Sequence, residues 1–208
     1  MIPELAPFVR IASKVPGWTR AREAEAMAQT AYDQPEDAVI VEIGSFFGGA
    51  SIVMAGARKL RGSGIVHCVD PFDGSGDPVS LMHYNAILTA FGGRPLQELF
   101  QENIDDAGLT EWVQAHRGTA EEVASGWSTP IDLLYLDGDQ SPDGARASYE
   151  AWTPWLKRNG IIALHNSNPR EYEPEHDGYY RLAVEEVHPP GFSNRFVVGS
   201  ITFGRKTA

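Results

Sequence analysis

Short apolar runs alternate with segments of helical pattern from residue 38 onward. Strands that are apolar throughout and separated by helices are typical of a parallel sheet with helices on both faces. The expected strands are residues 38–43, 64–69, 112–116, 131–136 and 161–164, and the expected helices lie near 48–61, 79–91, 96–106, 119–125 and 143–157. The alternation therefore predicts an α/β fold with a mostly parallel sheet.

Both ends of the last of these helices carry sequence signals. Ser141-Pro142-Asp143 combines a capping hydroxyl, a proline suited to the first turn and a favourable acid. Asn159-Gly160 offers a left-handed stop before the next strand.

The two ends of the chain differ from its middle. Residues 19–33 are rich in Ala and Glu, and we expect a helix that packs as a lid or flap before the first strand. Residues 179–187 have a helical pattern and residues 195–204 have the pattern of a strand. A parallel sheet with antiparallel strands at its C-terminal edge is a common mixed architecture.

Composition and charge exclude several function classes. The chain has 28 acidic and 17 basic side chains and a net charge of −11, which disfavours binding to nucleic acid or to an anionic membrane. The single cysteine, Cys68, excludes an intrachain disulfide, and no targeting segment is evident, so we expect a cytoplasmic protein. With 208 residues and no linker, we expect one domain, 1–208, with a helical lead-in (1–35) and a core (36–208).

The most informative segment is VIVEIGSFFGGAS, residues 39–51. A buried strand ends at Gly44 and a helix begins at Gly48, which allows a ligand to approach the backbone. The Gly-x-x-x-Gly spacing differs from the Gly-x-Gly-x-x-Gly of dinucleotide folds, and Glu42 would repel a pyrophosphate. A cationic ligand such as S-adenosylmethionine suits Glu42, and Asp70, after the second strand, is placed to bind a ribose diol. The alternative is an ordinary strand–helix turn.

Together these motifs resemble the class I S-adenosylmethionine-dependent methyltransferases, and within them the small-molecule O-methyltransferase branch with macrolide-sugar and catechol-type enzymes. Residues 15–27 resemble the lead-in helix, 41–51 the first cofactor motif, 69–75 the ribose-binding segment, and 131–166 the fourth and fifth strands with their linking helix. The resemblance implies a Rossmann-like fold whose seven-stranded, mostly parallel sheet has the order 3-2-1-4-5-7-6, with strand 7 antiparallel and helices on both faces.

The resemblance also implies positions for the cofactor. The methionine half of S-adenosylmethionine would be surrounded by the residues of the first motif, namely Glu42, Gly44, Ser45, Gly48 and Ser51. Asp70 would hold the ribose, and Asp137 would also contact the cofactor. The adenine edge would lie beside Gly118, Thr119 and Ala120, where the nearest acids are Glu121 and Glu122.

Loss of the acceptor's proton requires a general base or a divalent cation. Asp137 and Asp139 follow the fourth strand, and His165 and Asn166 follow the fifth, at the edge where ligands bind in open α/β sheets. In metal-dependent relatives the positions of Asp137, His165 and Asn166 bind or flank Mg²⁺. Here Gln140 and Asn166 replace the usual histidine and aspartate, so Mg²⁺ is one alternative, and His165 as base with Asp139 as second catalytic residue is the other.

The acceptor is a small molecule whose identity the sequence does not define. Residues 166–180 are polar and acidic, and as a substrate-capping loop they would favour a neutral polyol or a cation, whereas the alternative is a solvated loop. Trp18, Phe72 and Tyr84 are candidates for an acceptor pocket and equally for the core. Relatives in this branch often dimerise through N-terminal helices, which leaves a homodimer open.

Three functions compete at this point. The first is O-methylation of a sugar or secondary-metabolite hydroxyl. The second is a nicotinamide-dependent oxidoreductase, which the glycine spacing and Glu42 disfavour. The third is a non-catalytic binding protein with a methyltransferase fold, which the replacements at Gln140 and Asn166 leave open.

Overall fold

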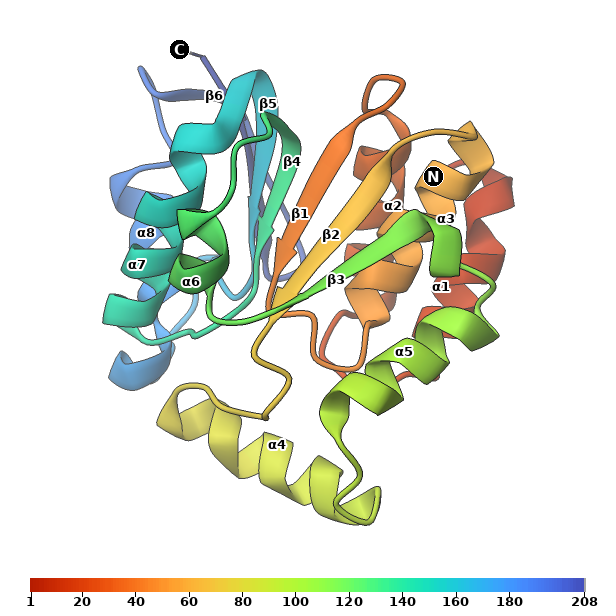
Figure 1. Cartoon of the computed structure of the whole chain (residues 1–208). Coiled ribbons are helices and arrows are strands. Elements are labelled where there is room, and N and C mark those ends of the chain that lie inside the picture. Colours follow the sequence, from red (N-terminus) through yellow and green to blue (C-terminus); the bar gives the residue numbers. More distant parts are fainter. Residues whose placement is uncertain (208) are drawn as a thin grey trace.

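A computed structural model describes residues 1–207, and Ala208, the last residue of the predicted domain, lies outside the described residues. Its strands form one sheet with the order β3-β2-β1-β4-β5-β7-β6 (Figure 1). The strands are β1 (Val39–Ile43), β2 (Ile65–Asp70), β3 (Val113–Arg117), β4 (Ile131–Leu136), β5 (Leu156–Leu164), β6 (Phe192–Val198) and β7 (Ile201–Lys206). β7 pairs antiparallel with both β5 and β6, whereas the other neighbouring strands pair in parallel, which confirms the predicted fold.

Helices cover both faces of this sheet (Figure 1). One face packs against α1 (Ala6–Ala12), α2 (Ala21–Tyr32), α3 (Gly49–Arg61) and α5 (Leu96–Asp106). The other packs against α6 (Ala120–Ser125), α7 (Pro142–Trp152) and α8 (Gly178–Glu185). The helix α4 (Pro78–Ala90) lies apart from both layers, beyond one end of the sheet, and of its side chains only Ser80 is buried.

The central strands are apolar throughout because both of their faces are buried. In β1, Ile40 belongs to the core beneath α3, whereas its neighbour Val41 belongs to the core beneath α7. Leu133 and Leu134 of β4 divide in the same way. Successive side chains of a strand point to opposite faces, so each strand contributes to two cores.

The predicted helix start at Ser141-Pro142-Asp143 is confirmed. The Ser141 hydroxyl accepts from the Gly144 backbone N–H at 3.1 Å, and Pro142 occupies the first turn of α7. At α6, Thr119 and Glu122 form a reciprocal capping box.

The predicted boundary between α7 and β5 is wrong. The helix ends at Trp152 rather than at residue 157, because the Pro154 segment (Thr153–Trp155) turns as a 3₁₀-helix. The strand then begins at Leu156 rather than at residue 161. Asn159 does adopt a left-handed conformation (φ 66°), but it does so inside β5 and not as a helix stop.

Both chain ends also depart from prediction. The expected strand 195–204 is a hairpin, because Gly199 (φ 61°) turns the chain between β6 and β7. The lead-in helix α2 is not a flap: Met27 and Ala28 are fully buried, and it packs on α3. Among residues 1–207, none of the helices has the length and apolar character needed to cross a membrane.

Candidate active site

Two cavities meet at the carboxyl ends of the parallel strands. The larger has a volume of about 720 Å³ and the smaller about 360 Å³. Gly44, Phe46, Tyr84 and Asp137 line both of them. This is the edge at which ligands bind in open α/β sheets.

The two glycines of the first motif have different tasks. Gly44 (φ 85°) lies so close to β4 that a Cβ atom there would be 2.4 Å from the Asp137 carbonyl oxygen. Gly48 (φ 91°) precedes α3, and a Cβ atom there would lie 3.1 Å from the Phe100 ring. Gly44 borders both cavities, whereas Gly48 borders neither and serves the start of the helix.

Glu42 and the serines around it form a buried polar group. Glu42 is 1% exposed and accepts a hydrogen bond from the Ser51 hydroxyl, and burial raises the pKa of its carboxyl to about 7. Ser51 is fully buried and borders neither cavity. Ser45, by contrast, lines the larger cavity, and its buried hydroxyl has no hydrogen-bond partner in residues 1–207.

Asp70 lies in the smaller cavity at the end of β2. Its two carboxylate oxygens accept from the backbone N–H groups of Phe46 at 2.9 Å and Phe72 at 2.6 Å. Burial raises the pKa of Asp70, and these hydrogen bonds oppose the increase. Each oxygen has a further lone pair for a ligand hydroxyl.

The predicted adenine segment lines the same smaller cavity. Gly118, Thr119 and Ala120 form part of its wall, together with Glu121. Glu122 instead accepts from the Thr119 backbone N–H in the capping box, so Glu121 is the free acid at this edge.

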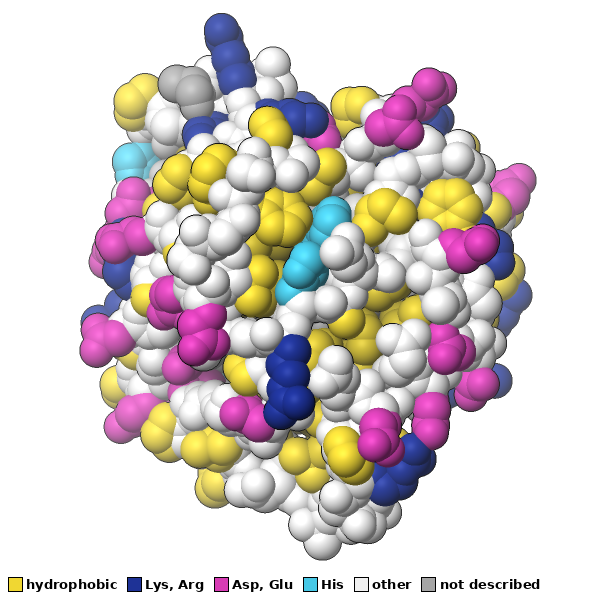
Figure 2. All heavy atoms as spheres, viewed as in Figure 1, with side chains coloured by type: hydrophobic (Ala, Val, Ile, Leu, Met, Phe, Trp, Pro, Cys, Tyr) yellow, Lys and Arg dark blue, Asp and Glu magenta, His cyan; other side chains and the backbone are white. Residues whose placement is uncertain are grey.

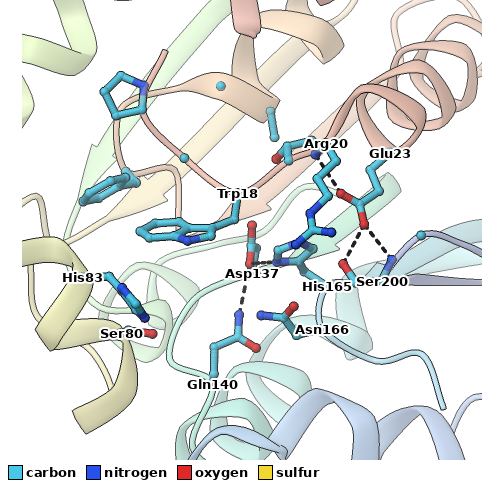
Figure 3. Close-up of a pocket in the computed structure, with 18 of the residues that line it drawn as sticks. Trp18, Arg20, Glu23, Ser80, His83, Asp137, Gln140, His165, Asn166 and Ser200 are labelled. Atoms are coloured by element: carbon cyan, nitrogen blue, oxygen red, sulfur yellow. Dashed lines mark hydrogen bonds and ion pairs between the residues drawn. The ribbon is translucent and has the colours of Figure 1, made fainter. Parts of the chain in front are cut away.

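Asp137 is the centre of a hydrogen-bonded group in the larger cavity (Figure 3). Oδ2 accepts from the Tyr135 hydroxyl at 3.0 Å, and Oδ1 accepts from Gln140 Nε2 at 3.0 Å. His165 Nδ1 lies 2.6 Å from the same Oδ1. Burial lowers the pKa of His165, but the Asp137 carboxylate outweighs this effect and the pKa is raised. His165 Nε2 makes no hydrogen bond within the described chain, and the residue lines the cavity.

These residues do not fit Mg²⁺ as they are arranged. Both oxygens of Asp137 accept from protein donors, and the Asn166 amide lies 3.2 Å from His176 Nε2. His165 would contribute nitrogen, whereas Mg²⁺ prefers oxygen ligands. In the described residues, no group of three or more His, Cys, Asp or Glu side chains could hold a metal ion. The set predicted for metal, Asp137, His165 and Asn166, is hydrogen-bonded within the protein, and its role in metal binding stays a prediction.

The structure separates the two predicted catalytic residues. Asp139 lines the smaller cavity, where its carboxylate accepts from the Ser141 backbone N–H at 2.8 Å. His165 lines the larger cavity. Asp139 therefore lies with the residues predicted for ribose and adenine.

Three aromatic rings form one wall of the larger cavity. The centroid of the Trp18 ring lies 5.6 Å from that of Phe46 and 5.4 Å from that of Tyr84. The rings of Phe46 and Tyr84 stack with their centroids 4.5 Å apart. Phe72, the third aromatic candidate from the sequence, is 4% exposed and packs in the core on Phe100.

The acidic loop after β5 does not present its acids to the cavity. Its lining residues are Asn166, Asn168, Arg170 and His176, whereas Asp177 pairs with Arg181 at 2.7 Å. Glu171, Glu173 and Glu175 are exposed and absent from the wall. The expectation that this loop selects a neutral polyol or a cation is therefore wrong.

Several residues of the larger cavity were missed at the sequence level. They come from the lead-in, from α4 and from the β6–β7 turn, and include Arg20, Arg22, Glu23, Ser80, His83 and Ser200 (Figure 3). Glu23 connects two of these segments, because its carboxylate accepts from the Arg20 N–H at 2.7 Å and the Ser200 N–H at 2.6 Å. The Arg-x-Arg spacing in the lead-in was the one available signal, and it is too common to identify a site.

Comparison with known families decides the class. Residues 41–167, more than half of the chain, match a family model described as a methyltransferase domain. The chain belongs to this methyltransferase family. The matched range begins in β1 and ends just after β5, so it includes the glycine turn, Asp70, Asp137 and His165 of this methyltransferase.

Solved structures agree on the fold of the methyltransferase. The O-methyltransferase NovP is 15% identical over 98% of this chain and 98% of its own, with a TM-score of 0.70. The O-methyltransferase TomG from Streptomyces achromogenes, involved in tomaymycin synthesis and solved with S-adenosylmethionine, is 16% identical over 100% of this chain and 91% of its own, with a TM-score of 0.66. An O-methyltransferase from Bacillus cereus, solved with S-adenosylhomocysteine, is 17% identical over 99% and 92%, with a TM-score of 0.62.

Proposed function

We propose that this methyltransferase transfers the methyl group of S-adenosylmethionine to a hydroxyl of a small molecule. The observation that carries the proposal is the unpartnered Nε2 of His165, on the wall of a cavity that also contains the glycine turn. The family match supports methyl transfer, and similar folds such as TomG are O-methyltransferases.

The residues of the two cavities suit this cofactor. When bound, S-adenosylmethionine supplies an electrophilic methyl group on its sulfonium. The free lone pairs of Asp70 accept from ribose hydroxyls, and Gly44 lets the ligand contact the backbone. The pKa of the Glu42 carboxyl is raised to about 7, so this group would supply its negative charge when the cationic half binds, and the Ser45 hydroxyl would find a partner there.

His165 acts on the acceptor as a general base. Its Nδ1 donates to Asp137, which fixes the tautomer that leaves Nε2 as the acceptor nitrogen. Neutral Nε2 takes the proton of the acceptor hydroxyl while the oxygen bonds to the methyl carbon. Gln140 and Tyr135 hold the Asp137 carboxylate in place, so no metal is needed to orient the base.

A calorimetric titration with S-adenosylhomocysteine tests the cofactor assignment, with NAD as control. We expect micromolar binding of S-adenosylhomocysteine and none of NAD. Selective binding of NAD would restore the oxidoreductase alternative, which the family match disfavours.

Turnover separates an enzyme from a non-catalytic binding protein of the same fold. Methyl transfer from labelled S-adenosylmethionine to a panel of hydroxylated compounds should be detectable, and should depend on His165. Cofactor binding without transfer to any of these acceptors, and without an effect of changing His165, would support the binding protein.

A further inference from the structure

The wall of the larger cavity has as many arginines as carboxylates, in a molecule whose net charge is −11. Asp and Glu side chains are spread over the face shown in Figure 2. Three arginines nevertheless line this one cavity, namely Arg20, Arg22 and Arg170. Two come from the start of α2 and one from the loop after β5. Figure 3 shows the side chain of Arg20 directed into the cavity.

The carboxylates of the cavity wall already have partners. Glu23 accepts from Ser200 and from the Arg20 backbone N–H, Glu42 accepts from Ser51, and Asp137 accepts from Tyr135 and Gln140. All of these donors are backbone, hydroxyl or amide groups. None of the three carboxylates uses an arginine side chain as its partner.

The three guanidinium groups have no acidic partner. Within residues 1–207, none of them makes an ion pair of 4.0 Å or less. Arg170 lies over the Tyr172 ring at 4.5 Å, and its Nη2 is 3.5 Å from Asn166 Oδ1. A guanidinium group can donate two parallel hydrogen bonds to one carboxylate, which makes arginine the side chain best suited to bind this group. The carboxylate of S-adenosylmethionine would occupy one arginine, which leaves cationic groups for the acceptor.

One further feature describes the acceptor. The aromatic wall of Trp18, Phe46 and Tyr84 offers a surface for a planar ring.

Building on the proposed function, we propose that the acceptor is a hydroxylated aromatic carboxylate. Arg20, Arg22 and Arg170 bind its carboxylate, the aromatic wall packs on its ring, and His165 deprotonates its hydroxyl.

The test measures binding to the protein saturated with S-adenosylhomocysteine. Two matched pairs of probes are used, protocatechuate with its amide and hydrocaffeate with its amide. Within a pair the two compounds differ in the negative charge, and the two pairs differ in the length of the chain between the ring and the carboxylate. We expect at least one acid to bind roughly tenfold or more tightly than its amide, which corresponds to about 1.4 kcal/mol. Exchange of arginines in the cavity, as Arg22→Gln or Arg170→Gln, should reduce this preference severalfold, and the double variant should remove most of it.

Arg195→Gln is the matched control, because Arg195 is an exposed arginine without an acidic partner and lies outside the cavity, on β6. It should leave both affinities unchanged. Equal affinity of acid and amide in both pairs, or no binding of any probe, would overturn the inference while leaving the proposed function intact. Loss of S-adenosylhomocysteine affinity in the double variant, in step with that of the acids, would assign the arginines to the cofactor and also overturn it. Failure of the unchanged protein to bind S-adenosylhomocysteine would overturn the proposed function itself.

Discussion

The two cavities are built in different ways. Most residues of the smaller one follow directly on the ends of β1, β2, β3 and β4, and helices add Tyr84, Leu96 and Ser148. The larger one shares Gly44 and Asp137 with it, but adds the lead-in, α4, the loop after β5 and the β6–β7 turn. The first is a product of sheet topology, and the second depends on contacts between segments that are distant in the chain.

The packing of the two regions differs as well. Around the glycine turn, Glu42, Ser45 and Ser51 are all buried. In the wall of the larger cavity, Trp18 is 40% exposed. The neighbouring helix α4 is held chiefly at its start, where Asp77 caps the helix and its Oδ1 lies 3.0 Å from His176 Nδ1. We infer that the residues around the glycine turn tolerate few substitutions, whereas Trp18 and α4 can vary without loss of the fold.

The largest effect is expected from removing the base. His165→Ala should lower the rate of methyl transfer by roughly 10²–10⁴-fold, the usual contribution of general-base catalysis. Affinity for S-adenosylhomocysteine should not change, because Nε2 acts on the acceptor. Rates and titrations on the same preparation check this, with the exposed His188→Ala as control. An unchanged rate would remove His165 from the reaction.

Asp70 sharpens the cofactor half of the comparison. Asp70→Ala should weaken S-adenosylhomocysteine binding by roughly 1.5–3 kcal/mol, since it removes hydrogen bonds to a charged group. Part of the loss reflects the freed N–H groups of Phe46 and Phe72. Calorimetry measures the change, and Asp73→Ala, an exposed aspartate in the same loop, is the control. Equal affinity of the Asp70 variant and the unchanged protein would exclude the ribose role.

The pH dependence reports on the same base. The raised pKa of His165 means that its imidazole is protonated, and unable to accept a proton, to a higher pH than an ordinary histidine. The rate should therefore increase with pH through a pKa above 6.5, falling about tenfold per unit below it. Asp137→Asn should move this limb of the profile to lower pH, because the carboxylate raises the pKa. A profile that does not move would separate Asp137 from the base.

Glu42 separates charge recognition from packing. Glu42→Gln should weaken binding of S-adenosylmethionine by about 1 kcal/mol more than that of S-adenosylhomocysteine, because only the former carries the sulfonium charge. Competition titrations of both ligands measure the difference. Equal losses would show that Glu42 supports the turn and does not act on the charge.

The smallest expected effect is that of metal removal. EDTA should leave the rate of methyl transfer unchanged, because the Asp137 oxygens are occupied by Tyr135, Gln140 and His165. Gln140→His combined with Asn166→Asp restores the residues usual in the metal-dependent branch and provides the comparison. Loss of rate on EDTA treatment of the unchanged protein would contradict the metal-free arrangement.

Sequence patterns predicted the parallel α/β sheet and the residues at its carboxyl edge, and the resemblance to class I methyltransferases implied the strand order. Apolar runs with helices between them predicted the parallel strands, and parallel strands bring their carboxyl ends to one edge whatever their side chains are. Asp70, Asp137 and His165 could therefore be placed near one another before any contact was known. Element bounds were less certain, as Pro154 and Asn159 show, because the α7–β5 junction depends on sheet register as well as on local propensity.

Only the tertiary structure decided which residues line the larger cavity. No local pattern indicates that Glu23 bonds to Ser200, 177 positions away, or that the acids after β5 face solvent while Arg170 lines the cavity. It also decided that Gln140 and His165 share one oxygen of Asp137, which makes the site a poor one for Mg²⁺. Strand ends converge by backbone geometry, which the sequence encodes locally, whereas these contacts arise only when packing brings distant side chains together.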